Sequence, residues 1–96
     1  MYEFITAAEK AQAEKILGTL GTMIHLGLLD DNYEAAKAEH EGKKDVHERL
    51  RGYLWGKLEI LEQLGKITFE EEDVLTRYFI DREVEMETKW KNPGKA

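Results

Sequence analysis

The densest group of potentially reactive side chains lies in the segment EHEGKKDVHE, residues 39–48. Two histidines and three further acids follow one another closely here: His40, Glu41, Asp45, His47 and Glu48. Imidazole nitrogens and carboxylate oxygens are ligands for divalent metals such as zinc. However, the helical zinc motif HExxH is missing, and Gly42 separates the two histidines at an expected turn. We therefore interpret the segment as a solvated turn and predict no metal and no cofactor, with a zinc site as the alternative.

A second group consists of paired carboxylates, Glu59 and Glu62 followed by Glu70 and Asp73. This ExxE and ExxD spacing on adjacent helices resembles the all-α nucleotide pyrophosphohydrolases. The resemblance implies that the four carboxylates hold magnesium against a phosphate chain. Only seven residues separate the two pairs, so that Glu70 and Asp73 fall in the first turn of the last expected helix. The helix macrodipole also explains acids at that position. A magnesium-dependent enzyme of this type remains the alternative to a non-catalytic protein.

Composition excludes several classes of function. The 96-residue chain has no cysteine and no serine, which excludes disulfides, thiolate ligands and serine nucleophiles. Its net charge is −6, and its lysines and arginines are scattered, which disfavours binding to nucleic acid. The N-terminal sequence MYEFITAAEK has no secretory signal pattern, so we expect a cytoplasmic protein.

The uncharged stretch ILGTLGTMIHLGLL, residues 16–29, is too short to span a membrane. Leu17, Leu20, Ile24 and Leu28 share one helical face, flanked by Ile16 and Met23. This spacing predicts a buried core helix, with His25 at the edge of its apolar face.

Helix start signals recur four times along the chain. A capping box pairs a side-chain acceptor with a glutamate three residues later, and it occurs at Thr6, Asp31, Asp45 and Thr68. Glycines at 42 and 65 are suited to end the second and third helices. We predict an all-α fold, a compact four-helix bundle with helices at about 7–29, 32–41, 46–64 and 69–90, the second one short. Residues 1–91 would form one domain and 92–96 a disordered tail, while the alternation within 84–91 leaves a strand as the alternative for that segment.

Five glycines lie inside the expected helices, where each costs ~1 kcal/mol relative to alanine, and three of them form patterns. Gly18 belongs to a small-residue face of the first helix, and Gly52 and Gly56 form a GxxxG spacing in the third. We interpret them as sites of close helix packing within the chain. Room for a ligand or for the helix of a partner is the alternative.

Apolar residues also lie outside the expected core faces. We assign Val46, Leu50, Tyr53, Leu54, Leu61 and Leu64 to the core face of the third helix, which leaves Trp55 on the opposite side beside Arg51. In the fourth helix, Ile80 and Val84 lie opposite a broad face made by Val74, Leu75, Tyr78, Phe79, Met86 and Trp90. Tryptophan and arginine are enriched in protein interfaces.

These features predict a small acidic interaction module without catalytic residues, an adaptor, regulator or inhibitor. It would bind a protein partner or a second copy through Trp55, Arg51, Ile80, Val84 and Trp90. Coverage of these residues by the chain itself is the alternative. By analogy of type alone, phage-encoded host-takeover and anti-defence proteins include small acidic helical chains of this kind. A small-ligand pocket opened by the glycines remains a further alternative.

Overall fold

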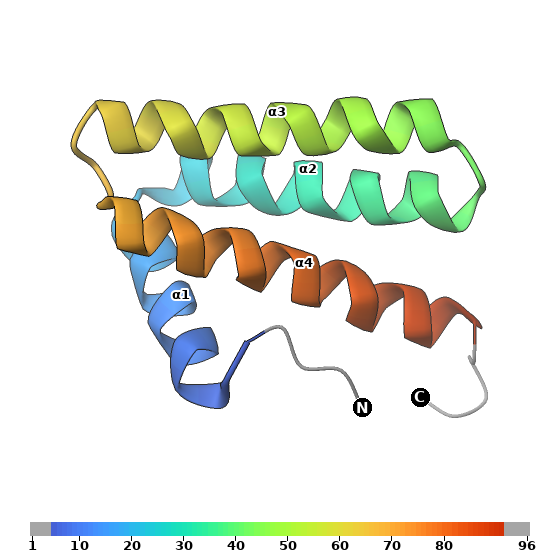
Figure 1. Cartoon of the computed structure of the whole chain (residues 1–96), viewed down its shortest axis with the longest axis horizontal. Coiled ribbons are helices and arrows are strands. Elements are labelled where there is room, and N and C mark those ends of the chain that lie inside the picture. The colour runs from blue at the N-terminus through green and yellow to red at the C-terminus, as the bar shows by residue number, and fades with distance from the viewer. Residues whose placement is uncertain (1–4, 92–96) are drawn as a thin grey trace.

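The computed structural model describes residues 5–91, and these form four α-helices, which confirms the all-α prediction (Figure 1). The helices are α1 (Ala7–Thr19), α2 (Thr22–His40), α3 (Lys44–Gln63) and α4 (Phe69–Lys91). Residues 84–91 belong to α4, so the strand alternative for that segment is wrong. The predicted tail, 92–96, lies outside the described residues.

The boundary between the first two helices differs from the prediction. The chain breaks at Gly21, whose φ of 90° and ψ of 149° is a conformation that L side chains rarely adopt. The uncharged stretch 16–29 therefore contains the end of α1 and the start of α2. The predicted helix 7–29 and the short helix 32–41 are both wrong, because α2 runs through Asp30 and Asp31 without interruption and has 19 residues.

Two of the four predicted capping boxes are present. Thr6 and Glu9 exchange hydrogen bonds at the start of α1, and Thr68 and Glu71 do so before α4. The boxes at Asp31 and Asp45 are wrong, since both residues lie within helices. Asp31 and Asp45 have the spacing of a capping box, but the turns before α2 and α3 contain Gly21 and Gly42 instead.

Helices α2 and α3 form an antiparallel hairpin, and α4 crosses beside it with α1 packed near the start of α4 (Figure 1). The hairpin turn contains Gly42, which has a φ of 77°. The backbone N–H of Lys43 there donates to the carbonyl of Ala38. This bond satisfies one of the carbonyls left open at a helix end, as in a Schellman motif. The predicted helix ends at Gly42 and Gly65 are confirmed.

All four helices contribute to the core. Its fully buried large apolar side chains are Phe79, Leu17, Leu28, Leu54, Leu58 and Leu75. The predicted core face of α3 is rotated from the real one, because Leu58 is buried whereas Tyr53 and Leu64 are exposed. In the uncharged stretch, Met23 and Ile24 are also exposed, because the break at Gly21 turns them away from the face that holds Leu17.

A polar side chain joins two of the core helices. Asn32 of α2 is completely buried, and its Nδ2 donates a hydrogen bond of 3.0 Å to the carbonyl of Phe79. Its Oδ1 accepts a hydrogen bond of 2.9 Å from Arg82 Nε. Both bonds run to α4, so Asn32 links α2 and α4 inside the core.

Candidate functional site

A polar cluster with two buried members lies where the hairpin turn meets α4. Its members are Glu39 of α2, His47 of α3, and Glu83 of α4, and each offers one potential ligand atom within 4.8 Å of the others. His47 Nε2 lies 2.8 Å from Glu39 Oε2 and 2.8 Å from Glu83 Oε1. Arg51 Nε donates to the other carboxylate oxygen of Glu83 at 2.8 Å. Three helices therefore contribute to one cluster of charged and polar groups, which we call the Glu39–His47–Glu83 cluster.

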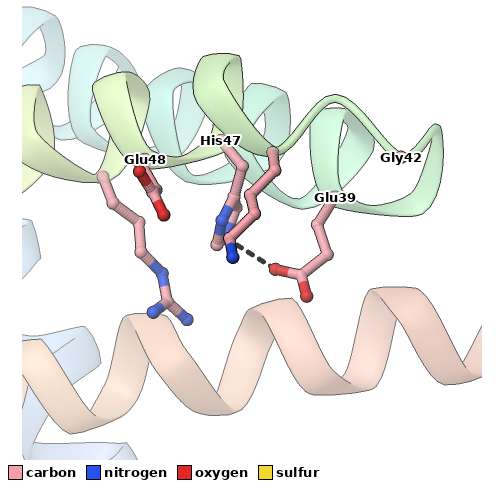
Figure 2. A pocket seen from close by; sticks show the side chains of 6 residues that line it. Glu39, Gly42, His47 and Glu48 are labelled. Atoms are coloured by element: carbon pink, nitrogen blue, oxygen red, sulfur yellow. Dashed lines mark ion pairs between the residues drawn. The ribbon is translucent and has the colours of Figure 1, made fainter.

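The cluster opens into a hollow of about 480 Å³ lined by Glu39, Gly42, Lys44, His47, Glu48 and Arg51. Figure 2 shows the side chains of Glu39 and His47 directed toward each other beneath the turn. Glu83 is the deepest member, with a side chain only 5% exposed, and it is balanced by the guanidinium of Arg51. A buried carboxylate with this pairing can hold a cation or a hydrogen-bond donor that enters from the hollow.

Sequence reasoning identified only part of this cluster. Within the segment 39–48, His47 joins the cluster, whereas His40 packs against Trp90 and Glu41 pairs with Lys43. Glu39 was not among the candidates from this segment, and Glu83 was missed entirely. A signal for it exists, since Glu83 follows Leu75 and Phe79 at intervals of four and therefore lies on the buried stripe of α4.

The outer groove of the α2–α3 hairpin is a second candidate site. Ile24, Leu28, Ile60, Leu61 and Leu64, with the stem of Lys57, line a hollow of about 280 Å³ there. Ile60 and Leu64 are 55% and 67% exposed.

This groove lies on the side of the hairpin away from α4. Asn32, His47 and Arg51 contact α4, whereas the exposed groove residues Ile60 and Leu64 lie on a different flank of α3. Leu28 and Leu61 form the buried floor of the groove and belong to the core, and Lys57, in an ion pair of 2.6 Å with Asp31, lines the groove as well. No other element of the described chain covers this face.

Most of the five residues predicted to bind a partner are contacted by other residues of the chain itself. Trp55 packs against the core, Arg51 is bound to Glu83, and Trp90 contacts the rings of Tyr33 and His40. Ile80 is half-buried. Val84 is the most open of the five at 44% exposure. The chain itself therefore covers much of this surface, although a role in partner binding stays a prediction.

The interpretation of Gly18, Gly52 and Gly56 as close packing within the chain is wrong. A Cβ added at any of the three would meet no other heavy atom within 4 Å. The three glycines lie at exposed or half-buried positions, and neither α1 nor α2 approaches Gly52 and Gly56 closely. Room for a ligand or for the helix of a partner stays the open alternative.

The alternative magnesium ligands also remain apart. Glu59, Glu70 and Asp73 are exposed and Glu62 is half-buried. Among residues 5–91, these four do not form a group with three ligand atoms close together, whereas Glu39, His47 and Glu83 do. Asp73 instead pairs with Arg77 of its own helix at 3.2 Å. The resemblance to nucleotide pyrophosphohydrolases therefore receives no support from the geometry.

A strongly perturbed carboxylate lies away from both candidate sites. The pKa of Glu9 is lowered from 4.5 to about 2, first by the hydrogen bond from Arg77 and then by the backbone N–H of Thr6. The Arg77 Nη2 atom lies 2.7 Å from Glu9 Oε2. This pair connects the first turn of α1 to α4, and the Arg77 contact together with the capping box accounts for the lowered pKa of Glu9.

Comparisons with known protein families, curated proteins and solved structures find no match to this chain. None of the helices formed by residues 5–91 has the length and apolar character needed to cross a membrane. Any functional proposal therefore rests on the chain's own side chains.

Proposed function

We propose that this protein is a non-catalytic interaction module of the cytoplasm that pairs with a second copy of itself through the outer groove of the α2–α3 hairpin. The observation that carries the proposal is the exposure of Ile60 and Leu64 beside Ile24 in an apolar hollow. Burying apolar surface is favourable by about 25 cal/mol per Å², so binding of a second chain over this groove would be stabilised by removing these side chains from water.

The spacing along α3 supports a helical occupant. Val46, Leu50, Tyr53, Lys57, Ile60 and Leu64 follow one another at alternating intervals of four and three residues. This period places them in one stripe along the groove flank of α3, separate from the buried stripe of Leu54, Leu58 and Leu61. A second helix packed along the stripe would contact it over the whole length of α3.

Symmetry explains why a second copy fits. A two-fold axis parallel to the hairpin places α3 of one copy over α2 of the other and brings the two apolar hollows face to face. Charges of opposite sign flank the stripe, since Glu34 of α2 lines a second hollow together with Val46 and Leu50, and Arg49 lies one turn from Tyr53 on α3. Neither Glu34 nor Arg49 makes an ion pair within residues 5–91, so both are available to the other copy.

Sedimentation equilibrium over a concentration series tests the proposal. We expect the wild-type chain to dimerise and Ile60→Glu to be monomeric, with helical circular dichroism unchanged because Ile60 is more than half exposed. Val84→Glu is the matched control, since it makes the same kind of change at an exposed position of α4.

Three results would overturn the proposal. A wild-type chain that stays monomeric at all concentrations contradicts it. So does an Ile60→Glu variant that still forms dimers. Loss of the dimer in Val84→Glu alone would assign the interface to the α4 surface that the sequence predicted.

A further inference from the structure

We propose that the Glu39–His47–Glu83 cluster is a zinc-binding site that connects α2, α3 and α4. This inference is independent of the proposed self-association, because the cluster faces α4 and the outer groove lies on the other flank of the hairpin.

The convergence of donors is the first argument. Two carboxylate oxygens from different helices lie 2.8 Å from the same ring nitrogen, His47 Nε2. A ring nitrogen carries at most one proton, and one N–H cannot point along both directions at once. A divalent cation among the three atoms binds the nitrogen lone pair and both oxygens together.

The donor types favour zinc over magnesium or calcium. Magnesium and calcium take oxygen ligands, whereas imidazole together with carboxylates suits zinc. Zinc bonds of about 2.0–2.1 Å in a tetrahedron keep ligand atoms about 3.3 Å apart. The two oxygens now lie 2.8 Å from His47 Nε2, so zinc binding requires each to move away from this nitrogen by about 0.5 Å. Glu39 accommodates this movement because its side chain is 48% exposed.

The surroundings of Glu83 meet a second requirement of such sites, a fixed orientation of the ligand. Arg51 Nε holds Oε2 at 2.8 Å, which directs Oε1 toward His47. Partners of this kind orient ligands and are commonly needed for affinity. Arg51 is therefore a positioning residue, and it offsets part of the negative charge of the two carboxylates.

Access and the remaining coordination position come from the hollow beside the turn. The side chains of His47 and Glu83 are 11% and 5% exposed, while Glu39 stands at the rim. Zinc enters from this side, and water from the hollow completes a four-coordinate site. The site differs from the zinc alternative considered for the segment 39–48 alone, because Glu83 comes from α4 and His40 is not included.

Isothermal titration of the metal-free, full-length chain with zinc chloride tests the proposal. We expect one zinc ion per chain and a melting temperature raised by about 11–22 °C at a free zinc concentration near one hundred times Kd. In NMR spectra that report on imidazole nitrogens, the Nε2 signal of His47 should shift, while those of His25 and His40 should not.

Glu39→Gln is the decisive variant, since its half-exposed position leaves the fold intact. We expect it to weaken zinc binding at least about tenfold. Glu48→Gln is the matched control, because Glu48 lines the same hollow without belonging to the cluster. Arg51→Met should weaken binding while leaving the stoichiometry at one.

Several outcomes overturn the assignment. The absence of zinc-induced heat and of any shift in melting temperature contradicts the proposed zinc site. Equal loss of affinity in Glu39→Gln and Glu48→Gln, or a shift of the His25 or His40 signals instead of His47, assigns the zinc to the general acidic surface. Equal binding of magnesium and zinc contradicts the role of the imidazole.

Discussion

The substitution Asn32→Ala tests how a single buried side chain places α2 against α4. The amide of Asn32 makes two hydrogen bonds across the helix interface, one to the carbonyl of Phe79 and one from Arg82. Alanine removes both bonds and leaves a space at a completely buried position. The helix itself tolerates the change, since alanine is the better helix former.

The magnitude follows from the two bonds. A neutral hydrogen bond contributes about 0.5–1.5 kcal/mol and one to a charged group about 1.5–3 kcal/mol. Arg82 is half-buried and regains part of its hydration in the variant, which favours the lower half of the combined range. Subtracting a helix-propensity gain of about 0.6 kcal/mol leaves a net loss in the free energy of unfolding of about 2 kcal/mol. This loss corresponds to a melting temperature lowered by roughly 8–16 °C for a domain of this size.

Urea unfolding followed by circular dichroism measures the loss. Asp30→Ala is the matched control on the same helix, because Asp30 is exposed and its replacement should change stability by less than about 0.5 kcal/mol. In a double-mutant cycle, Asn32→Ala and Arg82→Met should show a coupling energy of about 1 kcal/mol. Equal stability of the Asn32→Ala and Asp30→Ala variants, or a coupling near zero, would refute the reasoning.

Further predictions concern the ends of the helices. The lowered pKa of Glu9, about 2 against 4.5, means that its contact with Arg77 stabilises the fold above pH 4.5 and that this contribution is lost as the pH falls toward 2. The stability difference between wild type and Glu9→Gln in urea unfolding should therefore shrink over that interval, and a difference independent of pH would contradict the assignment. Gly21→Ala should lower the free energy of unfolding by about 1–3 kcal/mol, because its φ of 90° is strained for alanine. Gly18→Ala should instead raise it by about 0.5 kcal/mol, because the added Cβ meets open space inside a helix. The two changes are measured in the same unfolding assay, and equal signs would show that the break at Gly21 is not the strained position.

Much of the fold could be predicted because helix signals are local. The capping boxes at Thr6 and Thr68 and the glycine ends at 42 and 65 depend on residues within one turn of each other. The break at Gly21 was missed for the opposite reason. The uncharged stretch contains three glycines, Gly18, Gly21 and Gly27, and of these only Gly21 has a positive φ. The packing of α1 against α4 and of α2 against α3 requires a turn at that point, and spacing alone does not show this.

The candidate sites show the same division. His47 was singled out within one short segment, but Glu39 of the same segment was not, and their partner Glu83 lies 36 residues beyond His47 in the chain. The outer groove depends on which of two apolar stripes of α3 faces the core, and both stripes have helical spacing. The sequence predicted Tyr53 and Leu64 to be buried, whereas the structure leaves them exposed.

By itself, the sequence determined that this chain forms helices and where most of them begin and end, because capping, glycine turns and apolar spacing act over a few residues. It also determined the residue types available for chemistry, with no thiol and no serine hydroxyl. Only the tertiary structure decided which face of each helix is buried and which distant side chains meet. Which face is buried depends on the total apolar area that several helices bury against one another. No single segment of the sequence contains this information. The Glu39–His47–Glu83 cluster and the outer groove both result from this packing.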